Sequence, residues 1–205
     1  MTPVTNVIIC GTGGQGILLA SEILCSAARS AGNDVKKSEV HGMAQRGGSV
    51  SSHVRFGDKI YSPLVEKGCA DLILAMEKME GLRWASYLAP SGRLVACDLR
   101  INPMTVNTGL AEYPDIDAIM IEKKLPVSLV PAVEIAGELG NMKVVNVVLI
   151  GAVSTHLPIG LEHWHNAVRE RVPSKFLEIN LEAFRRGREL FGQAETRRTS
   201  RQVNR

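Results

Sequence analysis

The chain has 205 residues, of which 45% are hydrophobic, and this favours one domain with a sizeable core. No apolar run reaches the roughly 18 residues of a membrane span, and no charged leader precedes the first apolar segment, so we expect a cytoplasmic protein. The net charge of +3 comes wholly from residues 193–205, and the neutral remainder, with only 4% aromatic residues, argues against a nucleic-acid-binding protein.

Short apolar runs alternate with amphipathic or apolar segments of helical length along the chain. The predicted strands are residues 7–10, 34–40, 49–56, 70–76, 93–98 and 127–130. The predicted helices are residues 17–31, 77–88, 115–124, 132–139, 141–154, 161–171 and 175–191. We expect the third strand to bury one face and to turn at Gly57-Asp58 into a hairpin with residues 59–61. The helix at residues 141–154 is apolar on nearly every side, which predicts that it is buried, partly at a subunit interface.

This alternation predicts an α/β fold over residues 1–192: a Rossmann-like domain with a mostly parallel sheet, flanking helices and further helices at the C-terminal end. Residues 193–205 hold four arginines and one glutamate without apolar periodicity. We interpret them as a basic tail that is disordered, or ordered only against a partner.

A glycine-rich turn follows the first strand and opens the first helix. Gly11, Gly13 and Gly16 have the spacing of a dinucleotide-binding turn, in which glycines let the backbone approach a phosphate at a helix N-terminus. Gln15 places a long polar side chain at the mouth of this turn. The alternative is a tight turn that needs glycine for packing alone.

A dinucleotide-binding fold also requires an acidic residue about 20 residues further on, at the end of the second strand. Asp34 is near that distance but starts the strand, whereas Glu39 lies at its end and leads into another polar stretch. This requirement therefore leaves both interpretations of the turn open.

The second polar stretch carries His41, Gln45, Arg46, Gly47 and Gly48. The glycine pair permits a positive φ or a close backbone approach, and an arginine can bind a carboxylate or phosphate with two hydrogen bonds. We interpret this stretch as the functional loop, with an ordinary polar loop and glycine hinge as the alternative. Because open α/β sheets bind ligands beyond the carboxyl ends of their strands, both motifs should lie at one rim.

Other candidate chemistry is sparse. The four cysteines form no CxxC pair, so we expect neither a zinc site nor an Fe–S cluster. His163 and His165 lie two residues apart on a predicted helix and face different directions, so we predict no metal site there. Glu77 and Glu80 begin a predicted helix, where acidic residues are favoured by the helix dipole.

Together, residues 7–16 and 39–50 resemble the gamma-type subunits of 2-oxoacid:ferredoxin oxidoreductases, and within that family the indolepyruvate enzymes. The resemblance covers about residues 6–191 and leaves out the tail. The matching residues are Gly11, Gly13, Gly14, Gln15 and Gly16 in the first motif, and His41, Gln45, Arg46, Gly47 and Gly48 in the second.

The resemblance implies a subunit of an enzyme that oxidatively decarboxylates a 2-oxo acid with coenzyme A, makes an acyl-CoA and reduces ferredoxin. Thiamine diphosphate and the Fe–S clusters would belong to a large partner subunit. This chain would dock beside the thiamine site, help to form the coenzyme A and substrate pocket, and be inactive alone. The 2-oxo acid and a homo-oligomer of the isolated chain stay open. The alternatives are a stand-alone NAD(P)-dependent oxidoreductase and a non-catalytic scaffold module.

Overall fold

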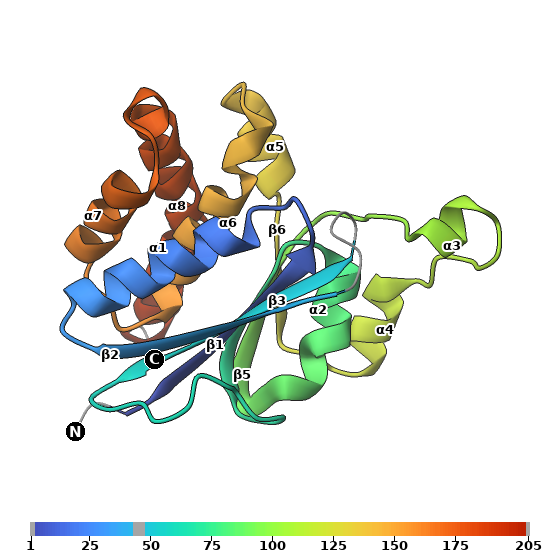
Figure 1. The fold of residues 1–205 in the computed structure, drawn as a ribbon, viewed down its shortest axis with the longest axis horizontal. Coiled ribbons are helices and arrows are strands. Elements are labelled where there is room, and N and C mark those ends of the chain that lie inside the picture. Colours follow the sequence, from blue (N-terminus) through green and yellow to red (C-terminus); the bar gives the residue numbers. More distant parts are fainter. Residues whose placement is uncertain (1–2, 43–47, 204–205) are drawn as a thin grey trace.

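The computed structural model describes residues 3–42 and 48–203, with side chains described to residue 191. Within these residues the chain forms a six-stranded sheet with helices on both faces (Figure 1). The strands are β1 (Thr5–Thr12), β2 (Asp34–His41), β3 (Ser49–Gly57), β4 (Ala70–Ala75), β5 (Leu88–Cys97) and β6 (Val127–Val130). The α-helices are α1 (Ile17–Ser30), α2 (Lys78–Trp84), α3 (Met104–Asn107), α4 (Ile116–Glu122), α5 (Ala132–Glu138), α6 (Val145–Val153), α7 (Leu161–Arg171) and α8 (Leu177–Val203).

The strand order is β2-β3-β1-β4-β5-β6. Strands β1, β4, β5 and β6 are parallel, whereas β3 runs antiparallel to both β1 and β2. The predicted α/β fold with a mostly parallel sheet is therefore confirmed, with one reversed strand. Because of that reversal, the beginning of β3 lies beside the ends of β1 and β2: Ser49 pairs with Thr12, and Val50 pairs with His41.

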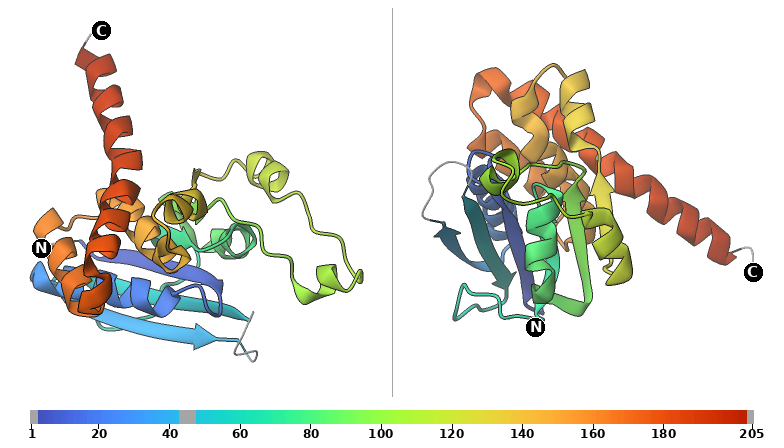
Figure 2. Two further views of the ribbon diagram at one scale, coloured as in Figure 1. Left: turned by 90° about the horizontal axis from the view of Figure 1, so that it is seen from above. Right: turned by 90° about the vertical axis from the view of Figure 1, so that its right-hand side faces the viewer.

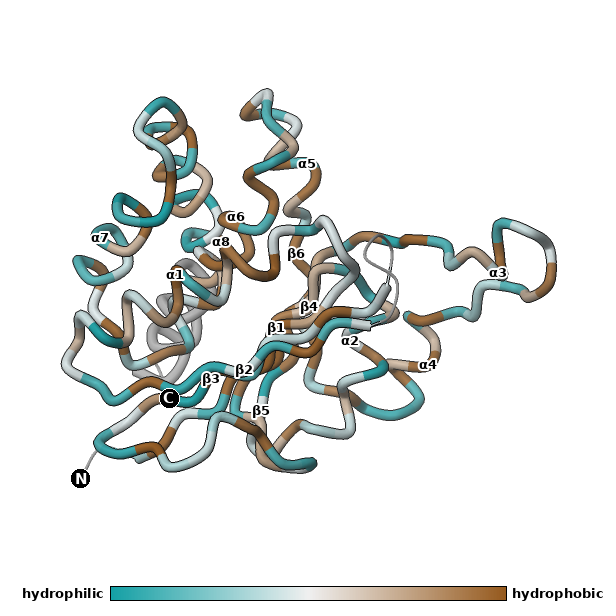
Figure 3. The backbone as a smooth tube through the Cα atoms, viewed as in Figure 1, coloured by the Kyte–Doolittle hydropathy of each residue, from teal (hydrophilic) through white to brown (hydrophobic). Residues whose placement is uncertain are grey.

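Alternate residues of β1 enter two separate cores. Val7 and Ile9 belong to the larger core, which lies under α1 and α5 to α8. Ile8 and Cys10 face α2 and α4 and form the smaller core with residues such as Met120. Figures 1 and 3 show these two helical layers and the apolar strands between them. The helix α6 is buried over almost its whole length, as its sequence predicts.

Two predictions about β3 are wrong. Residues 58–61 form no strand, and the backbone N–H of Ile60 instead donates to Asp34 Oδ2 at 2.8 Å. Both faces of β3 are buried, because α1 covers one face and residues outside the sheet, such as Val65 and Trp84, cover the other. On the face opposite α1, His53 packs edge-on against Trp84, with ring centroids 5.5 Å apart.

The predicted helix at residues 77–88 ends earlier than expected, and β5 begins at Leu88. This strand passes through Pro90, which lacks a backbone N–H. The pairing with β4 shifts register between Ala70 and Leu72, opposite Leu88 and Arg93, so Pro90 takes no place in the ladder. The predicted helix at 141–154 is likewise shorter, because a 3₁₀ turn (Met142–Val144) precedes α6 and another (Ser154–His156) follows it.

Two parts of the chain project from the body. The short helix α3 lies on an arm between β5 and α4, and the end of α8 extends away from the other helices (Figure 2). The backbone of α8 is helical to Val203, which includes most of the tail for which the sequence predicts disorder or partner-dependent order. The division at residues 192/193 stays a prediction. Among the described residues, no helix is long and apolar enough to cross a membrane.

Candidate functional site

The glycine turn lies at the carboxyl end of β1, at the centre of the sheet. Its last residue, Gly16, is the N-cap of α1 and has a φ of 77°. This left-handed conformation favours glycine. A Cβ at Gly16 would overlap the amide of Asn146, whose Nδ2 donates to Gly16 O at 3.1 Å. The conformation and the contact with α6 both require glycine at this position.

Gln15 closes the turn from inside the protein. Its Oε1 accepts the backbone N–H of Thr12 at 2.6 Å, and its Nε2 donates to Met76 O at 3.2 Å. A Cβ at Gly11 would lie 2.6 Å from Gln15 Oε1 and 2.7 Å from Met76 Cβ. The amide of Gln15 therefore connects the ends of β1 and β4, and Gly11 leaves room for it.

The two glycine motifs share one rim, as the sequence predicts. The backbone N–H of Gly13 donates to Gly48 O at 3.0 Å, directly before β3 begins. At the end of β2, the side chain of His41 is 52% exposed, with its Nε2 3.7 Å from Glu39 Oε2. Gln45, Arg46 and Gly47, predicted for the same site, lie outside the described residues.

A cavity of about 740 Å³ lies between the two motifs. Its wall combines the glycine turn, the first turn of α1 and the end of β2: Gly13, Gly14, Gly16, Ile17, Leu18, Leu19, His41, Gly42 and Val50. A cavity of this size accommodates a small organic ligand. Of the predicted site residues, the structure thus brings Gly13, Gly14, Gly16 and His41 around one space.

Two buried acidic residues border the same rim from the α2 side. Glu77 is the N-cap of α2 and accepts the N–H groups of Met79 at 3.0 Å and Glu80 at 2.5 Å. Burial raises the pKa of the Glu77 carboxyl despite these hydrogen bonds. The sequence predicts only a favourable interaction of Glu77 with the helix dipole. In the structure, Glu77 also caps the helix through these two hydrogen bonds.

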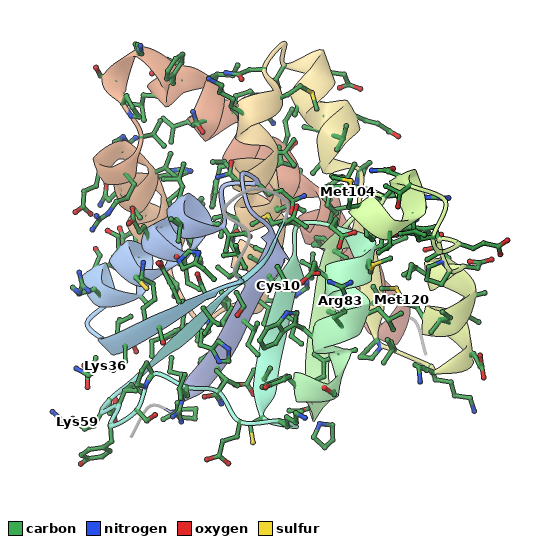
Figure 4. All side chains as sticks on the ribbon, turned by 45° about the vertical axis from the view of Figure 1, so that its right-hand side comes forward. Cys10, Lys36, Lys59, Arg83, Met104 and Met120 are labelled. Carbon is green, nitrogen blue, oxygen red and sulfur yellow. The ribbon has the colours of Figure 1, made fainter. Side chains whose placement is uncertain are left out.

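Glu80 connects α2 to the second motif. Its side chain is 2% exposed, and its carboxylate accepts Ser49 Oγ–H at 2.6 Å and Arg83 Nη1–H at 2.5 Å. A further cavity of about 390 Å³ borders Glu80, Arg83 and Met104 between α2 and the arm (Figure 4). Burial and the nearby Glu80 and Glu77 carboxylates raise the pKa of the Cys10 thiol well above its usual value, so this thiol stays neutral.

Sequence reasoning missed Glu80 as a support for the second motif and missed Asn146 entirely. Asn146 is the polar residue within an otherwise apolar segment, and that interruption was the available signal. Glu80 had no comparable signal, because its partner Ser49 lies 31 residues away in the chain.

The candidate metal ligands are used in other ways. His163 Nδ1 lies 2.9 Å from Ser30 Oγ, and His165 packs edge-on against Phe184. Among residues 3–42 and 48–191, no three His, Cys, Asp or Glu side chains are placed to hold a metal ion. Cys10, Cys25 and Cys97 are buried as free thiols, and Cys69 is exposed.

The sheet topology separates the glycine turn from the acidic residue that a dinucleotide-binding fold would require. In that fold the acid ends the strand after the first helix. Here Glu39 lies near the end of β2, and β3 is inserted between β2 and β1. Asp34 starts β2, and the pKa of its carboxyl is lowered by the Ile60 N–H that it accepts.

The chain is similar to known proteins over nearly its whole length. The family model described as pyruvate ferredoxin/flavodoxin oxidoreductase matches residues 6–190. The chain is 41% identical to indolepyruvate oxidoreductase subunit IorB of Archaeoglobus fulgidus over 187 residues, which cover 89% of this chain and 92% of that protein. It is 42% identical to the subunit of the same name from Pyrococcus horikoshii over 185 residues, covering 87% and 92%.

A solved structure has the same fold. The gamma subunit of a keto/oxoacid ferredoxin oxidoreductase from Geobacter sulfurreducens superimposes with a TM-score of 0.66 at 25% identity. The match covers 90% of this chain and 96% of that one. Because the match covers most of both chains, the two proteins share the fold of the whole domain and not only the glycine turn.

Proposed function

Because the chain belongs to the pyruvate ferredoxin/flavodoxin oxidoreductase family, we propose that it is a subunit of a 2-oxoacid:ferredoxin oxidoreductase, with indolepyruvate as the substrate. The observation that carries the proposal within the structure is the Gly13–Gly48 hydrogen bond, which joins the two motifs around one cavity at the carboxyl rim. We infer indolepyruvate as the substrate because the relatives at 41% and 42% identity are subunits of indolepyruvate oxidoreductases.

The reaction joins the acyl group of a 2-oxo acid to coenzyme A, releases carbon dioxide and gives two electrons to ferredoxin. Thiamine diphosphate supplies the stabilised carbanion for decarboxylation, and Fe–S clusters carry the electrons, which is chemistry that side chains do not provide. The described cysteines do not fit a cluster, because three of them are buried apart in β1, α1 and β5. We therefore assign both cofactors to a large partner subunit.

The residues of this chain would bind and orient coenzyme A or the 2-oxo acid. The cavity between the glycine turn and His41 is the proposed place where this subunit meets coenzyme A or the 2-oxo acid. Arg46, by its sequence position, would contact a coenzyme phosphate or a carboxylate of the partner subunit. No proton-transfer step is assigned to His41, whose exposed ring lies near Glu39.

A stand-alone NAD(P)-dependent oxidoreductase is the alternative that the glycine turn alone suggests. The inserted β3 and the use of the Gly13 N–H by Gly48 count against it. A non-catalytic scaffold module is the second alternative. It differs from the proposal in one outcome: substitutions at His41 or Arg46 would leave the assembled complex fully active.

Co-expression with the large subunit tests the proposal. The isolated chain should not oxidise any 2-oxo acid with coenzyme A and a one-electron acceptor, and the assembled complex should oxidise indolepyruvate. Thiamine diphosphate and iron should be found in the complex and be absent from the isolated chain. Oxidation by the isolated chain, or a complex without activity on any 2-oxo acid, would refute the assignment. The cytoplasmic location stays a prediction of the sequence.

A further inference from the structure

The strand β2 forms an open edge of the sheet. It is the terminal strand in the order β2-β3-β1-β4-β5-β6, and within residues 3–42 and 48–203 no other strand pairs with its outer side. Figure 1 shows β2 along the outside of the sheet, beside β3. An edge strand presents unpaired N–H and carbonyl groups, so it can pair with a strand of another chain. The proposed function makes no use of these backbone groups.

The pairing with β3 shows which backbone groups of β2 face outward. The N–H of Gly42 donates to Ser49 O at 2.9 Å, so Gly42 faces β3. Residues of an antiparallel strand alternate between facing their neighbour and facing away from it, and every second residue before Gly42 therefore also faces β3. The outward backbone groups belong to the other four residues of β2, which are Val35, Lys37, Glu39 and His41.

The side chains of these four outward residues share the face of the sheet that α1 covers, where Val35 packs against the larger core. At the centre of the row, Lys37 Nζ lies 2.7 Å from Glu39 Oε1. Lysine on an edge strand often prevents pairing with another chain, but here Glu39 neutralises Lys37 within the strand. The outward row therefore carries one positive and one negative charge, two residues apart.

Only one antiparallel register of two β2 edges uses all four outward residues of each copy. Outward residues must lie opposite outward residues, and this register pairs Val35 with His41 of the second copy. It also places each Lys37 opposite the Glu39 of the other copy. A shift by two residues in either direction shortens the ladder and places Lys37 opposite Lys37, or Glu39 opposite Glu39. Opposite charges in such pairs are stabilising and like charges are destabilising.

We propose that β2 pairs with β2 of a second copy of this chain in this register, which joins the two sheets across a two-fold axis at Ser38. The self-complementary charges specify a second copy rather than an unrelated strand. On the face opposite α1, Val40 is 52% exposed, and the aliphatic stem of Lys36 from the second copy covers it. Because His41 borders the proposed binding cavity, the pairing also holds one wall of that cavity in place.

Disulfide trapping in the isolated full-length chain tests the register, in a Cys69→Ser background because Cys69 is exposed. The two copies of Ser38 should lie directly opposite each other, with Cα atoms about 4.5 Å apart, which suits a disulfide. Under mild oxidation, Ser38→Cys should therefore give a covalent dimer on a non-reducing gel. Lys36→Cys is the matched control, because its two copies are offset along the strands by on the order of 13 Å. No dimer of Ser38→Cys, or equal trapping of both variants, overturns the inference.

Charge reversal tests the recognition, with dimerisation of the isolated chain measured by analytical ultracentrifugation. The wild type should dimerise in the micromolar range, because one strand from each copy makes a small interface. Lys37→Glu places acidic residues opposite one another, and Glu39→Lys does the same with basic residues, so each should weaken dimerisation about tenfold. Lys36→Glu is the matched control, because it changes the same charge opposite an apolar residue and should dimerise like the wild type.

A mixture of the two charge-reversed chains separates lost pairing from misfolding. In a heterodimer of Lys37→Glu with Glu39→Lys, acidic residues lie opposite basic residues at every central position, so mixing should restore the wild-type dimer affinity. A mixture that dimerises no better than its components overturns the inference, as does a wild-type chain that stays monomeric throughout the micromolar range. Both of these outcomes leave the proposed function intact, because its test is the activity of the complex with the large subunit.

Discussion

The backbone N–H of Gly13 donates to the carbonyl oxygen of Gly48 at 3.0 Å, across 35 residues of chain. In a dinucleotide-binding turn, backbone N–H groups of this kind are directed at a phosphate. Here β3 runs antiparallel beside β1, and the residue before it takes the N–H instead. Since Gln15 also binds the Thr12 N–H, the turn is held closed by the protein itself.

The closed turn predicts that the isolated chain does not bind nicotinamide dinucleotides. Titration of NADH and of NADPH, followed by nicotinamide fluorescence, should show no saturation at micromolar concentrations. The physical reason is twofold: β3 separates the turn from Glu39 near the end of β2, and Gly48 occupies the Gly13 N–H. Micromolar binding of either dinucleotide would favour the stand-alone oxidoreductase over the subunit assignment.

The contact between Gly16 and Asn146 predicts a large cost for a methyl group in the turn. Gly16→Ala places an L-residue at a φ of 77° and drives its Cβ into the Asn146 amide. We expect the free energy of unfolding to fall by about 2–4 kcal/mol, measured by chemical denaturation, since left-handed strain of about 1–2 kcal/mol adds to the overlap.

Gly137→Ala is the matched control for this substitution. Gly137 lies within α5, and a Cβ there would meet no atom within 4 Å. The free energy of unfolding should rise by about 0.5–1 kcal/mol, because alanine favours a helix over glycine. A similar effect of both substitutions would mean that the turn tolerates a side chain at Gly16.

The elements that could be predicted from the sequence are those with a regular pattern of apolar residues. Alternating apolar runs indicated the sheet, and the rule that carboxyl ends of parallel strands meet placed both motifs at one rim. The reversal of β3 had a signal that the prediction did not use. Eight residues separate Val40 from Ser49, which suits an antiparallel connection, whereas a parallel crossover needs a dozen or more.

The contacts that support the rim had no periodic signal. Asn146 binds Gly16 across 130 residues, and Glu80 binds Ser49 across 31. Such pairs depend on how α6 and α2 dock against the sheet, which composition and spacing do not encode. The described structure supplies them, whereas the positions of Gln45, Arg46 and Gly47 still rest on the sequence.

The buried cap Glu77 predicts a pH-dependent stability. Its folded-state pKa is raised by burial, so the protonated form favours folding. The stabilisation by the protonated Glu77 carboxyl is fully present below the unfolded-state pKa of a glutamate, about 4.3. It is lost as the pH rises through the higher pKa of this carboxyl in the folded state. The unfolding free energy of the wild type minus that of Glu77→Gln should therefore decrease as the pH rises from below 4.

Glu77→Gln also loses one of two cap hydrogen bonds, because its amide has a single acceptor oxygen. That loss is independent of pH and shifts the whole curve, so the slope alone reports the titration. Glu134→Gln is the control, since Glu134 also lies in the first turn of a helix, α5, but is exposed to solvent. A flat difference for Glu77→Gln would show that the carboxyl has its ordinary pKa.

In the assembled complex, Arg46 is expected to contribute to turnover or to coenzyme A affinity. If Arg46 contacts an anionic group of coenzyme A or of the partner subunit, Arg46→Ala removes one charge-assisted hydrogen-bonded contact. Such a contact contributes about 1.5–3 kcal/mol, so kcat/KM or the apparent affinity for coenzyme A should fall roughly ten- to a hundredfold. Assembly with the large subunit, followed by size-exclusion chromatography, should be unchanged.

Arg29→Ala is the control, because Arg29 is exposed in the last turn of α1, at the opposite end of that helix from the glycine turn. It removes the same charge from the same chain and should leave coenzyme A kinetics unchanged. Equal activity of Arg46→Ala and Arg29→Ala would remove Arg46 from the site while the family assignment stands. If the complex fails to assemble with Arg46→Ala but assembles with Arg29→Ala, Arg46 contacts the partner subunit rather than coenzyme A. The loss of a coenzyme contact alone would not break the interface between the subunits.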